Sequence, residues 1–218
     1  MKLLAIETST EACSVALGVG SEVTERLALE NRSHGERVLP WVAELMAGAE
    51  LGYQDLDGIV VSQGPGGFTS LRIGLAIVQG MALGAGLPVY PVSSLATLAR
   101  EGFLARGPGH FLAILDARMG EVYTGGYQVG EGELQLVGEE SLVRPAQVAV
   151  PGPGSWAGCG SGFPAYPGIL ENALGSALDG VVEDCWPRAR SLLSLASTVN
   201  PRSPSVLEPV YLRDRVAG

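Results

Sequence analysis

One local pattern occurs twice in this chain and constrains its fold more than any other feature. Residues 3–15 and 112–124 both contain a short apolar strand, an acid, a turn of small residues and a second β-like run. The two acids are Glu7 and Asp116. Such a repeat predicts an α/β protein of two duplicated halves, with the two acids facing each other across a cleft. The alternative is chance similarity between two apolar strands.

The other predicted elements fit an α/β class. Hydrophobic periodicity and turn residues predict strands at 3–7, 13–19, 22–31, 58–62, 88–91 and 134–143, and helices at 34–48, 69–86, 169–178, 189–199 and from Ser93. Ser33 is the predicted N-cap of the first helix, with Glu36 completing a capping box. Residues 151–168 are so rich in proline and glycine that we expect mostly loop, and 206–213 should be extended. We predict domains at 1–103 and 104–218, the second reduced in regular structure and more irregular.

Composition limits what the chain can bind by itself. The 218 residues carry a net charge of −9, so the surface repels polyanions, and any nucleic-acid role would need a basic partner. Arginines in the last thirty-odd residues, up to Arg215, form only a weak basic cluster. The three cysteines are far apart and suggest neither disulfides nor a zinc site. The N-terminal apolar run ends at Glu7, too early for a secretion signal, and we expect a cytoplasmic protein without a membrane span.

A glycine-rich turn at 64–67 joins a predicted strand to a predicted helix. Backbone N–H groups at such a turn can bind phosphate, helped by the helix dipole. The turn lacks the GK[ST] ending of a P-loop and the GxGxxG spacing of a dinucleotide fold, and the only lysine in the chain is Lys2. We therefore favour a simple tight turn over a phosphate site.

The helix that follows, 69–86, is the stronger indication of function. Its only long polar side chains are Arg72 and Gln79, although a helix on one sheet needs a polar outer face. Glycines inside it cost about 0.5–1 kcal/mol each relative to alanine, which makes sense where something approaches the backbone closely. We predict that this helix and helix 34–48 form a protein interface; the alternative is that the second covers the first within the subunit. The predicted interface residues are Trp41, Met46, Arg72, Ile73, Ile77, Gly80 and Gly84.

Most familiar catalytic groups are missing from the sequence. The two histidines, His34 and His110, are too far apart for an HExxH or HxxxH metal pair, and we expect His34 to be solvated. No GxSxG nucleophile motif is present. Glu7 and Asp116 could hold a magnesium nucleotide if the duplication is real, or could cap turns at strand ends. A small-molecule kinase or ATPase using these two acids is the alternative function.

Several longer motifs resemble the bacterial TsaB (YeaZ) family. They are Ile6-Glu7-Thr8-Ser9-Thr10, QGPGGFTSLRIGLAIVQGMALG from Gln63, Pro91-Val92-Ser93-Ser94-Leu95 and DARMGEVY from Asp116. The similarity is dense over residues 1–125 and sparse afterwards, apart from Gly160 and Tyr211-Leu212-Arg213. The resemblance implies an actin-like, sugar-kinase-like (ASKHA) fold of two duplicated halves, the second reduced.

The resemblance also implies a function. Proteins of this family serve in making threonylcarbamoyladenosine at position 37 of tRNAs that read codons beginning with A. A paralogue, TsaD, performs the transfer with a metal held by a histidine pair, and the ATPase TsaE joins them. Because this sequence lacks that pair, it resembles the non-catalytic partner. The resemblance implies that the two N-terminal-half helices bind TsaD, or a second copy of the chain when TsaD is absent, and that tRNA is reached only through the complex. No cofactor is expected in the isolated chain; whether ATP or ADP binds at the joint with TsaD stays open.

Overall fold

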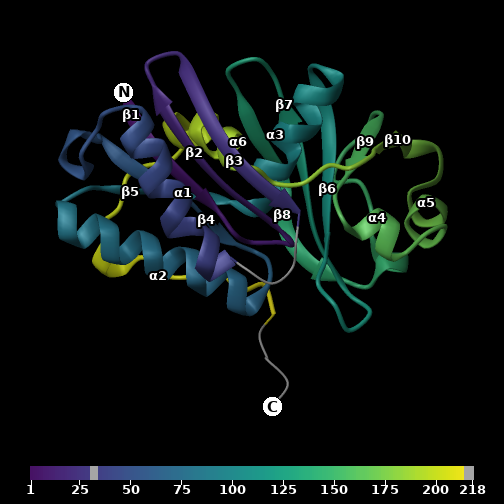
Figure 1. Ribbon diagram of the computed structural model, residues 1–218. Coiled ribbons are helices and arrows are strands. Elements are labelled where there is room, and N and C mark those ends of the chain that lie inside the picture. Colours follow the sequence, from purple (N-terminus) through teal and green to yellow (C-terminus); the bar gives the residue numbers. More distant parts are fainter. Residues whose placement is uncertain (30–33, 214–218) are drawn as a thin grey trace. The chain divides into compact units, whose positions relative to one another are not determined.

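The computed structural model describes residues 1–29 and 34–213 and contains two five-stranded sheets (Figure 1). The first has the order β3-β2-β1-β4-β5, and its strands are β1 (Lys2–Glu7), β2 (Ala12–Val19), β3 (Glu22–Leu29), β4 (Gly58–Gly64) and β5 (Val89–Ser93). The second has the order β10-β9-β6-β7-β8, and its strands are β6 (Gly109–Asp116), β7 (Val122–Val129), β8 (Leu134–Val143), β9 (Trp156–Cys159) and β10 (Leu178–Val182). Ser33 and Arg215, together with the end of the predicted strand 22–31, lie outside the described residues.

The two sheets have the same topology, which confirms the predicted duplication. In the first, β1, β2 and β3 pair antiparallel, while β4 pairs parallel with β1 and β5 parallel with β4. In the second, β6, β7 and β8 pair antiparallel, while β9 pairs parallel with β6 and β10 parallel with β9. Glu7 and Asp116 end the equivalent strands β1 and β6.

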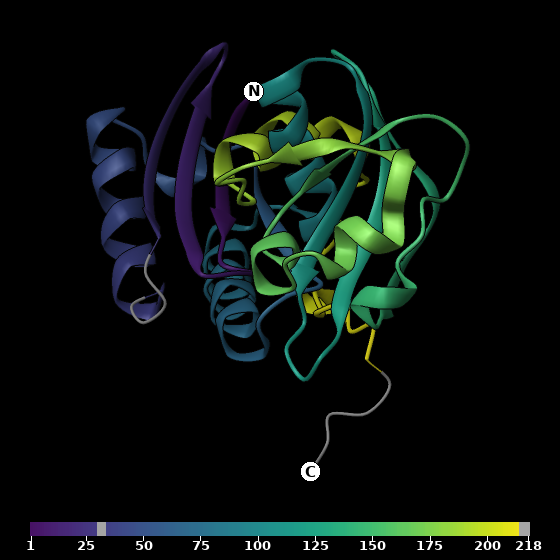
Figure 2. The same ribbon diagram turned by 90° about the vertical axis from the view of Figure 1, so that its right-hand side faces the viewer.

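The reduction of the second half concerns its helices and leaves its sheet complete. The strand β3 is followed by α1 (His34–Gly48), whereas β8 is followed only by the 3₁₀ turn η2 (Pro145–Gln147). The 18-residue helix α2 (Phe68–Ala85) follows β4, whereas the short helices α4 (Gly162–Ala165) and α5 (Ile169–Leu174) follow β9. Figure 2 shows α4 and α5, in green, lying across the second sheet.

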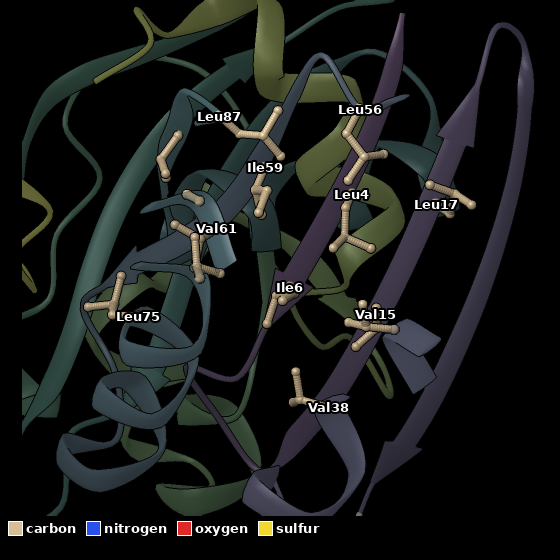
Figure 3. Close-up of a cluster of buried hydrophobic side chains, with 14 of the residues drawn as sticks. Leu4, Ile6, Val15, Leu17, Val38, Leu56, Ile59, Val61, Leu75 and Leu87 are labelled. Carbon is tan, nitrogen blue, oxygen red and sulfur yellow. The ribbon is translucent and has the colours of Figure 1, made fainter. Parts of the chain in front are cut away.

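The core of the first unit lies between its sheet and the helix pair α1 and α2 (Figure 3). Alternate residues of β1 and β2 point toward this helix layer because strand side chains alternate between faces. The buried side chains that meet there include Leu4, Ile6, Val15, Leu17, Val38, Ile59, Val61 and Leu75. Burying each such side chain contributes roughly 1.5–3 kcal/mol, so this layer holds α1 and α2 on the sheet.

The chain divides differently from the predicted boundary at 103/104. One compact unit contains residues 1–94 and 187–210, and the other contains 95–186 and the end of the chain from Tyr211. The helix α3 (Ser94–Arg106) therefore belongs almost entirely to the second unit, although it follows β5 directly. The helix α6 (Ala189–Leu195) follows β10 but belongs to the first unit, where the N–H of Ala189 donates to Ser14 Oγ at 2.7 Å. Tertiary contacts far apart in sequence set this boundary, so no local signal marks it.

Other segments of the same chain pack against the glycine turn 64–67. The N–H of Gly67 donates to the carbonyl of Ser9 at 2.7 Å, and a Cβ on Gly66 would overlap that carbonyl. Gly64 has φ +108°, and a Cβ there would lie 2.8 Å from the carbonyl of Val210. Close approach of two other chain segments explains these glycines, and this geometry supports the tight-turn interpretation.

Two strands were not predicted. The strand β9 lies inside the segment 151–168 that we expected to be mostly loop, and β10 begins at the end of the predicted helix 169–178, which ends at Leu174 instead. Both strands are short and contain glycine, and their ladder partners are β6 and each other. Pairing with a distant strand, rather than local periodicity, therefore determines them.

Two glycines of α2 differ in the space available for a side chain. A Cβ on Gly74 would overlap Thr8 Oγ1, which is buried, whereas a Cβ on Gly80 has no other atom within 4 Å. We expect Gly74→Ala to lower the free energy of unfolding by about 1–3 kcal/mol through overpacking. Gly80→Ala should raise it by about 0.5–1 kcal/mol because alanine is the better helix former. Urea unfolding of both variants measures these free energies. Equal effects of the two substitutions would contradict the difference in packing between Gly74 and Gly80.

Candidate functional site

One face of α2 is exposed along its length. Arg72, Ala76, Gly80, Leu83 and Gly84 are all exposed, and spacings of four and three residues place them on the same side of the helix. Leu83 is 57% exposed although it is a large apolar side chain. The glycines leave the backbone open here, since neither Gly80 nor Gly84 would bring a Cβ within 4 Å of another group. We call these five residues the α2 outer face.

The two long polar side chains of α2 both contact neighbouring groups. The guanidinium carbon of Arg72 lies 3.5 Å from the centroid of the Phe68 ring, so the charge stacks along the helix. Gln79 donates to the carbonyl of Pro204 at 2.9 Å, which ties α2 to the 3₁₀ turn η5 (Pro204–Val206). Both predicted polar positions therefore lie against neighbouring groups, and the α2 outer face has an apolar and glycine-rich centre.

The predicted interface residues fall into three groups. Arg72, Gly80 and Gly84 belong to the α2 outer face, whereas Ile73 and Ile77 are partly buried. Trp41 on α1 is also partly buried and packs against the core. Met46 is only 4% exposed and belongs to the core itself, so its placement on the interface is wrong.

The error at Met46 has a physical cause. Apolar residues surround much of α1, and periodicity alone does not say which of them faces the sheet. Leu39, at 48% exposure, is the large apolar side chain that α1 presents to solvent, and the prediction missed it. No signal in the sequence separates Leu39 from Val38 and Val42, because all three are apolar and only the fold shows which of them are buried.

Glu7 is a buried acid at the end of β1. Its side chain has no exposed surface, and its Oε1 accepts a hydrogen bond from the N–H of Ser9 at 2.6 Å. Within the described residues, Oε2 has no hydrogen-bond partner. Burial disfavours the charged form and raises the pKa of Glu7 to about 7. Glu7 therefore changes charge near neutral pH.

Asp116, at the end of β6, is engaged within its own turn. Its Oδ1 accepts from the N–H of Arg118 at 2.9 Å and from the hydroxyl of Tyr166 at 3.1 Å, and its Oδ2 lies 3.0 Å from the Arg118 guanidinium. Arg213 holds the same turn through an ion pair of 2.6 Å with Glu121. These contacts favour the turn-capping interpretation of Asp116, while a nucleotide role for Glu7 and Asp116 stays a prediction.

The two histidines also have structural contacts. His34 is buried, and its Nε2 lies 3.0 Å from the carbonyl of Thr10, so the expectation of a solvated side chain is wrong. The contact joins the start of α1 to the β1–β2 turn. His110 stacks on Trp156 with ring centroids 4.8 Å apart. In residues 1–29 and 34–213, no group of three or more histidine, cysteine or acidic side chains could hold a metal ion.

By length and composition alone, α2 could cross a membrane. Its mean hydropathy is 1.3, and 28% of its residues are buried. The helix packs on β4 and α1 within the first unit, with Leu71, Leu75 and Val78 buried. The same composition suits a helix that is covered by another protein, and one such helix is weak evidence for a membrane span.

Comparison with known proteins identifies relatives along the whole chain. A family model for TsaD, tRNA N6-adenosine threonylcarbamoyltransferase, matches residues 26–162. The tRNA threonylcarbamoyladenosine biosynthesis protein TsaB of Escherichia coli (strain K12) is 38% identical, covering 100% of this chain and 96% of the relative. The protein of the same name from Haemophilus influenzae is 36% identical over 99% of this chain and 95% of its own.

Solved structures similar to this chain carry the YeaZ name as well. The structure of YeaZ from Pseudomonas aeruginosa aligns with a TM-score of 0.89 at 36% identity, covering 97% of this chain and 99% of that one. Another structure, described as an uncharacterized protein with similarity to peptidase YEAZ from Pseudomonas aeruginosa, aligns with a TM-score of 0.90. Together with the two identical sheet topologies, these matches show the ASKHA-type fold.

The buried acid gives a pH-dependent prediction. Because the pKa of Glu7 rises from 4.5 to about 7 on folding, its proton stabilises the fold below pH 4.5, and this contribution is lost as pH rises through 7. The variant Glu7→Gln keeps an oxygen acceptor for Ser9. Between pH 5 and pH 8, we expect its free energy of unfolding to rise by up to about 3 kcal/mol relative to that of wild type. Urea unfolding at several pH values measures the difference. The control is Glu36→Gln at an exposed position; a constant difference between Glu7→Gln and wild type across this range would contradict the prediction.

Proposed function

Because this chain belongs to the TsaB (YeaZ) family, we propose that it acts in tRNA threonylcarbamoyladenosine biosynthesis as the non-catalytic subunit that binds TsaD. Full-length relatives named for this biosynthesis support the pathway. The partner role rests on one observation, the apolar and glycine-rich α2 outer face.

The α2 outer face and the neighbouring surface of α1 suit a protein partner. At 1.5 Å per residue and about 10 Å in width, the two helices present on the order of 500 Å². This is the larger part of the roughly 800 Å² that each side of a standard interface buries. Open backbone at Gly80 and Gly84 allows a partner helix to approach closely, and Leu39 and Leu83 supply exposed apolar area.

The match to the TsaD family model supports the choice of partner. TsaD shares the fold over residues 26–162, which include both α1 and α2. A related chain can therefore offer an equivalent helix pair, and the same surface can pair with TsaD or with a second copy of this chain through a two-fold arrangement. We propose the homodimer as the form taken when TsaD is absent.

Charge supports an indirect role toward tRNA. With a net charge of −9, this chain does not provide the cationic surface that phosphate binding needs. We propose that TsaD and TsaE supply it and that tRNA is contacted only through the cytoplasmic complex. ATP or ADP, if it binds, would then lie at the joint with TsaD, because both oxygens of Asp116 are already engaged and Glu7 is buried.

The competing function is a small-molecule kinase or ATPase that uses Glu7 and Asp116. The engaged oxygens of Asp116 do not favour it. Tight ATP binding by the chain without a partner would favour the kinase, whereas binding only in a mixed complex favours the subunit. A peptidase activity has no support from a nucleophile motif in the sequence.

Substitution on the α2 outer face tests the interface. Gly80→Leu places a bulky side chain at the centre of that face, where the chain itself offers no clash. We expect the affinity for TsaD to fall at least about tenfold, which corresponds to about 1.4 kcal/mol, and self-association to weaken likewise. Analytical ultracentrifugation and titration calorimetry measure both.

The control for this substitution is Gly132→Leu, at an exposed position between β7 and β8 where a Cβ also meets no atom within 4 Å. It should leave both associations unchanged, and both variants should keep the wild-type circular dichroism. Wild-type affinity in Gly80→Leu would rule out the α2 outer face as the interface.

Reconstitution tests the non-catalytic role. The purified chain alone should neither hydrolyse ATP nor modify tRNA, while adding it to TsaD and TsaE should restore modification. Gly80→Leu should lower the reconstituted rate in proportion to its loss of binding, and saturating amounts of the variant should recover it. Turnover by the isolated chain, measured by mass spectrometry of tRNA nucleosides, would overturn the assignment.

A further inference from the structure

A cavity of about 430 Å³ lies in the second unit, beyond the carboxyl ends of β9 and β10. In open α/β sheets, ligands bind in the crevice outside the carboxyl ends of parallel strands. The volume is within the range of small-molecule sites, roughly 300–1,000 Å³. The cavity is formed by α4, α5, β10 and the segment after β10, and none of the residues of the proposed interface belongs to it.

The walls of this cavity are apolar and partly aromatic. Phe163 and Cys185 are buried, and Val181, Val182 and Trp186 are half-buried. Aromatic side chains can bind both apolar groups and organic cations, because the ring face carries partial negative charge. The walls therefore accept a ligand with an apolar body, and they do not by themselves select its charge.

Charged residues at the cavity determine which sign of ligand charge it favours. Glu171, Glu183 and Asp184 line it and are exposed, and no lysine or arginine is among its lining residues. Within the described part of the chain, none of the three carboxylates makes a side-chain hydrogen bond or ion pair. Three acids elsewhere in this unit, Asp116, Glu121 and Asp179, are instead paired with arginines. The three unpaired carboxylates disfavour a phosphate or carboxylate ligand and favour a cation.

We propose that this cavity binds an organic cation, an ammonium or guanidinium group carried on an apolar or aromatic body. The apolar part packs against Phe163, Val181 and Trp186, and the charged group lies among the carboxylates of Glu171, Glu183 and Asp184. Such a group can come from a free amine or from a lysine or arginine side chain of a partner protein. Both sources share this chemistry.

The test is a titration of the full-length protein with benzamidine, a cation, and benzamide, its neutral isostere. The indole ¹⁵N–¹H signal of Trp186, assigned with Trp186→Phe, reports binding. We expect benzamidine to shift this signal with an affinity at least about tenfold higher than that of benzamide. The difference should shrink as salt is added, because the carboxylates are exposed and screened.

The double variant Glu183→Gln/Asp184→Asn should lower the affinity for benzamidine about tenfold and leave benzamide unchanged. The control, Glu131→Gln/Glu133→Gln, removes the same charge from the exposed β7–β8 loop and should change neither. Equal affinities for the two probes, or benzamidine binding that the double variant does not weaken, would overturn the proposal. Unchanged circular dichroism confirms that both variants fold.

A second arm identifies the source of the cation. If a partner side chain occupies the cavity, adding purified TsaD should abolish the response of Trp186 to benzamidine. If a free amine is the ligand, the response should persist in the complex. Only this arm depends on the proposed function, so failure of the complex to form leaves the titration of the free protein as an independent result.

Discussion

The position of α2 depends on its close approach to the β1–β2 turn. Gly66 and Gly74 lie so near Ser9 and Thr8 that neither has room for a Cβ, and the N–H of Gly67 completes the contact by donating to Ser9. With one side of α2 fixed against this turn and the sheet, the opposite side must face outward. The exposed glycine-rich face is therefore a consequence of the packing on the buried side.

The protonation of Glu7, which precedes the same turn, depends on its burial. Its burial follows from the layers on the two sides of β1, with α1 and α2 over one face and α6 contacting the sheet. Burial raises its pKa toward neutrality, while the equivalent acid of the second half, Asp116, stays paired with Arg118 and Tyr166. Two acids at the same topological position therefore have different environments, one buried and one paired. The shorter helices α4 and α5 also border the acid-lined cavity.

Much of the fold could be predicted from local sequence. The repeat of 3–15 at 112–124 predicted equivalent strands, and helices 34–48 and 69–86 were predicted almost to their ends because their periodicity is long. The strands β9 and β10 were missed because short strands depend on ladder partners distant in sequence. At the site, Gly80 and Gly84 were placed correctly on the surface, but Met46 was not, since a helix that is apolar on several sides does not reveal which side is buried.

The sequence by itself determined the duplicated α/β class, the family resemblance, the absence of a histidine metal pair and the apolar character of α2. These features depend on residue types and spacings within short segments. Only the tertiary structure decided which glycines are closely packed and which leave the helix surface open. It also decided that Glu7 titrates near neutral pH and that three carboxylates line one cavity. Each of these depends on contacts between segments that are far apart in the chain, because burial and electrostatic environment are created only when those segments pack together.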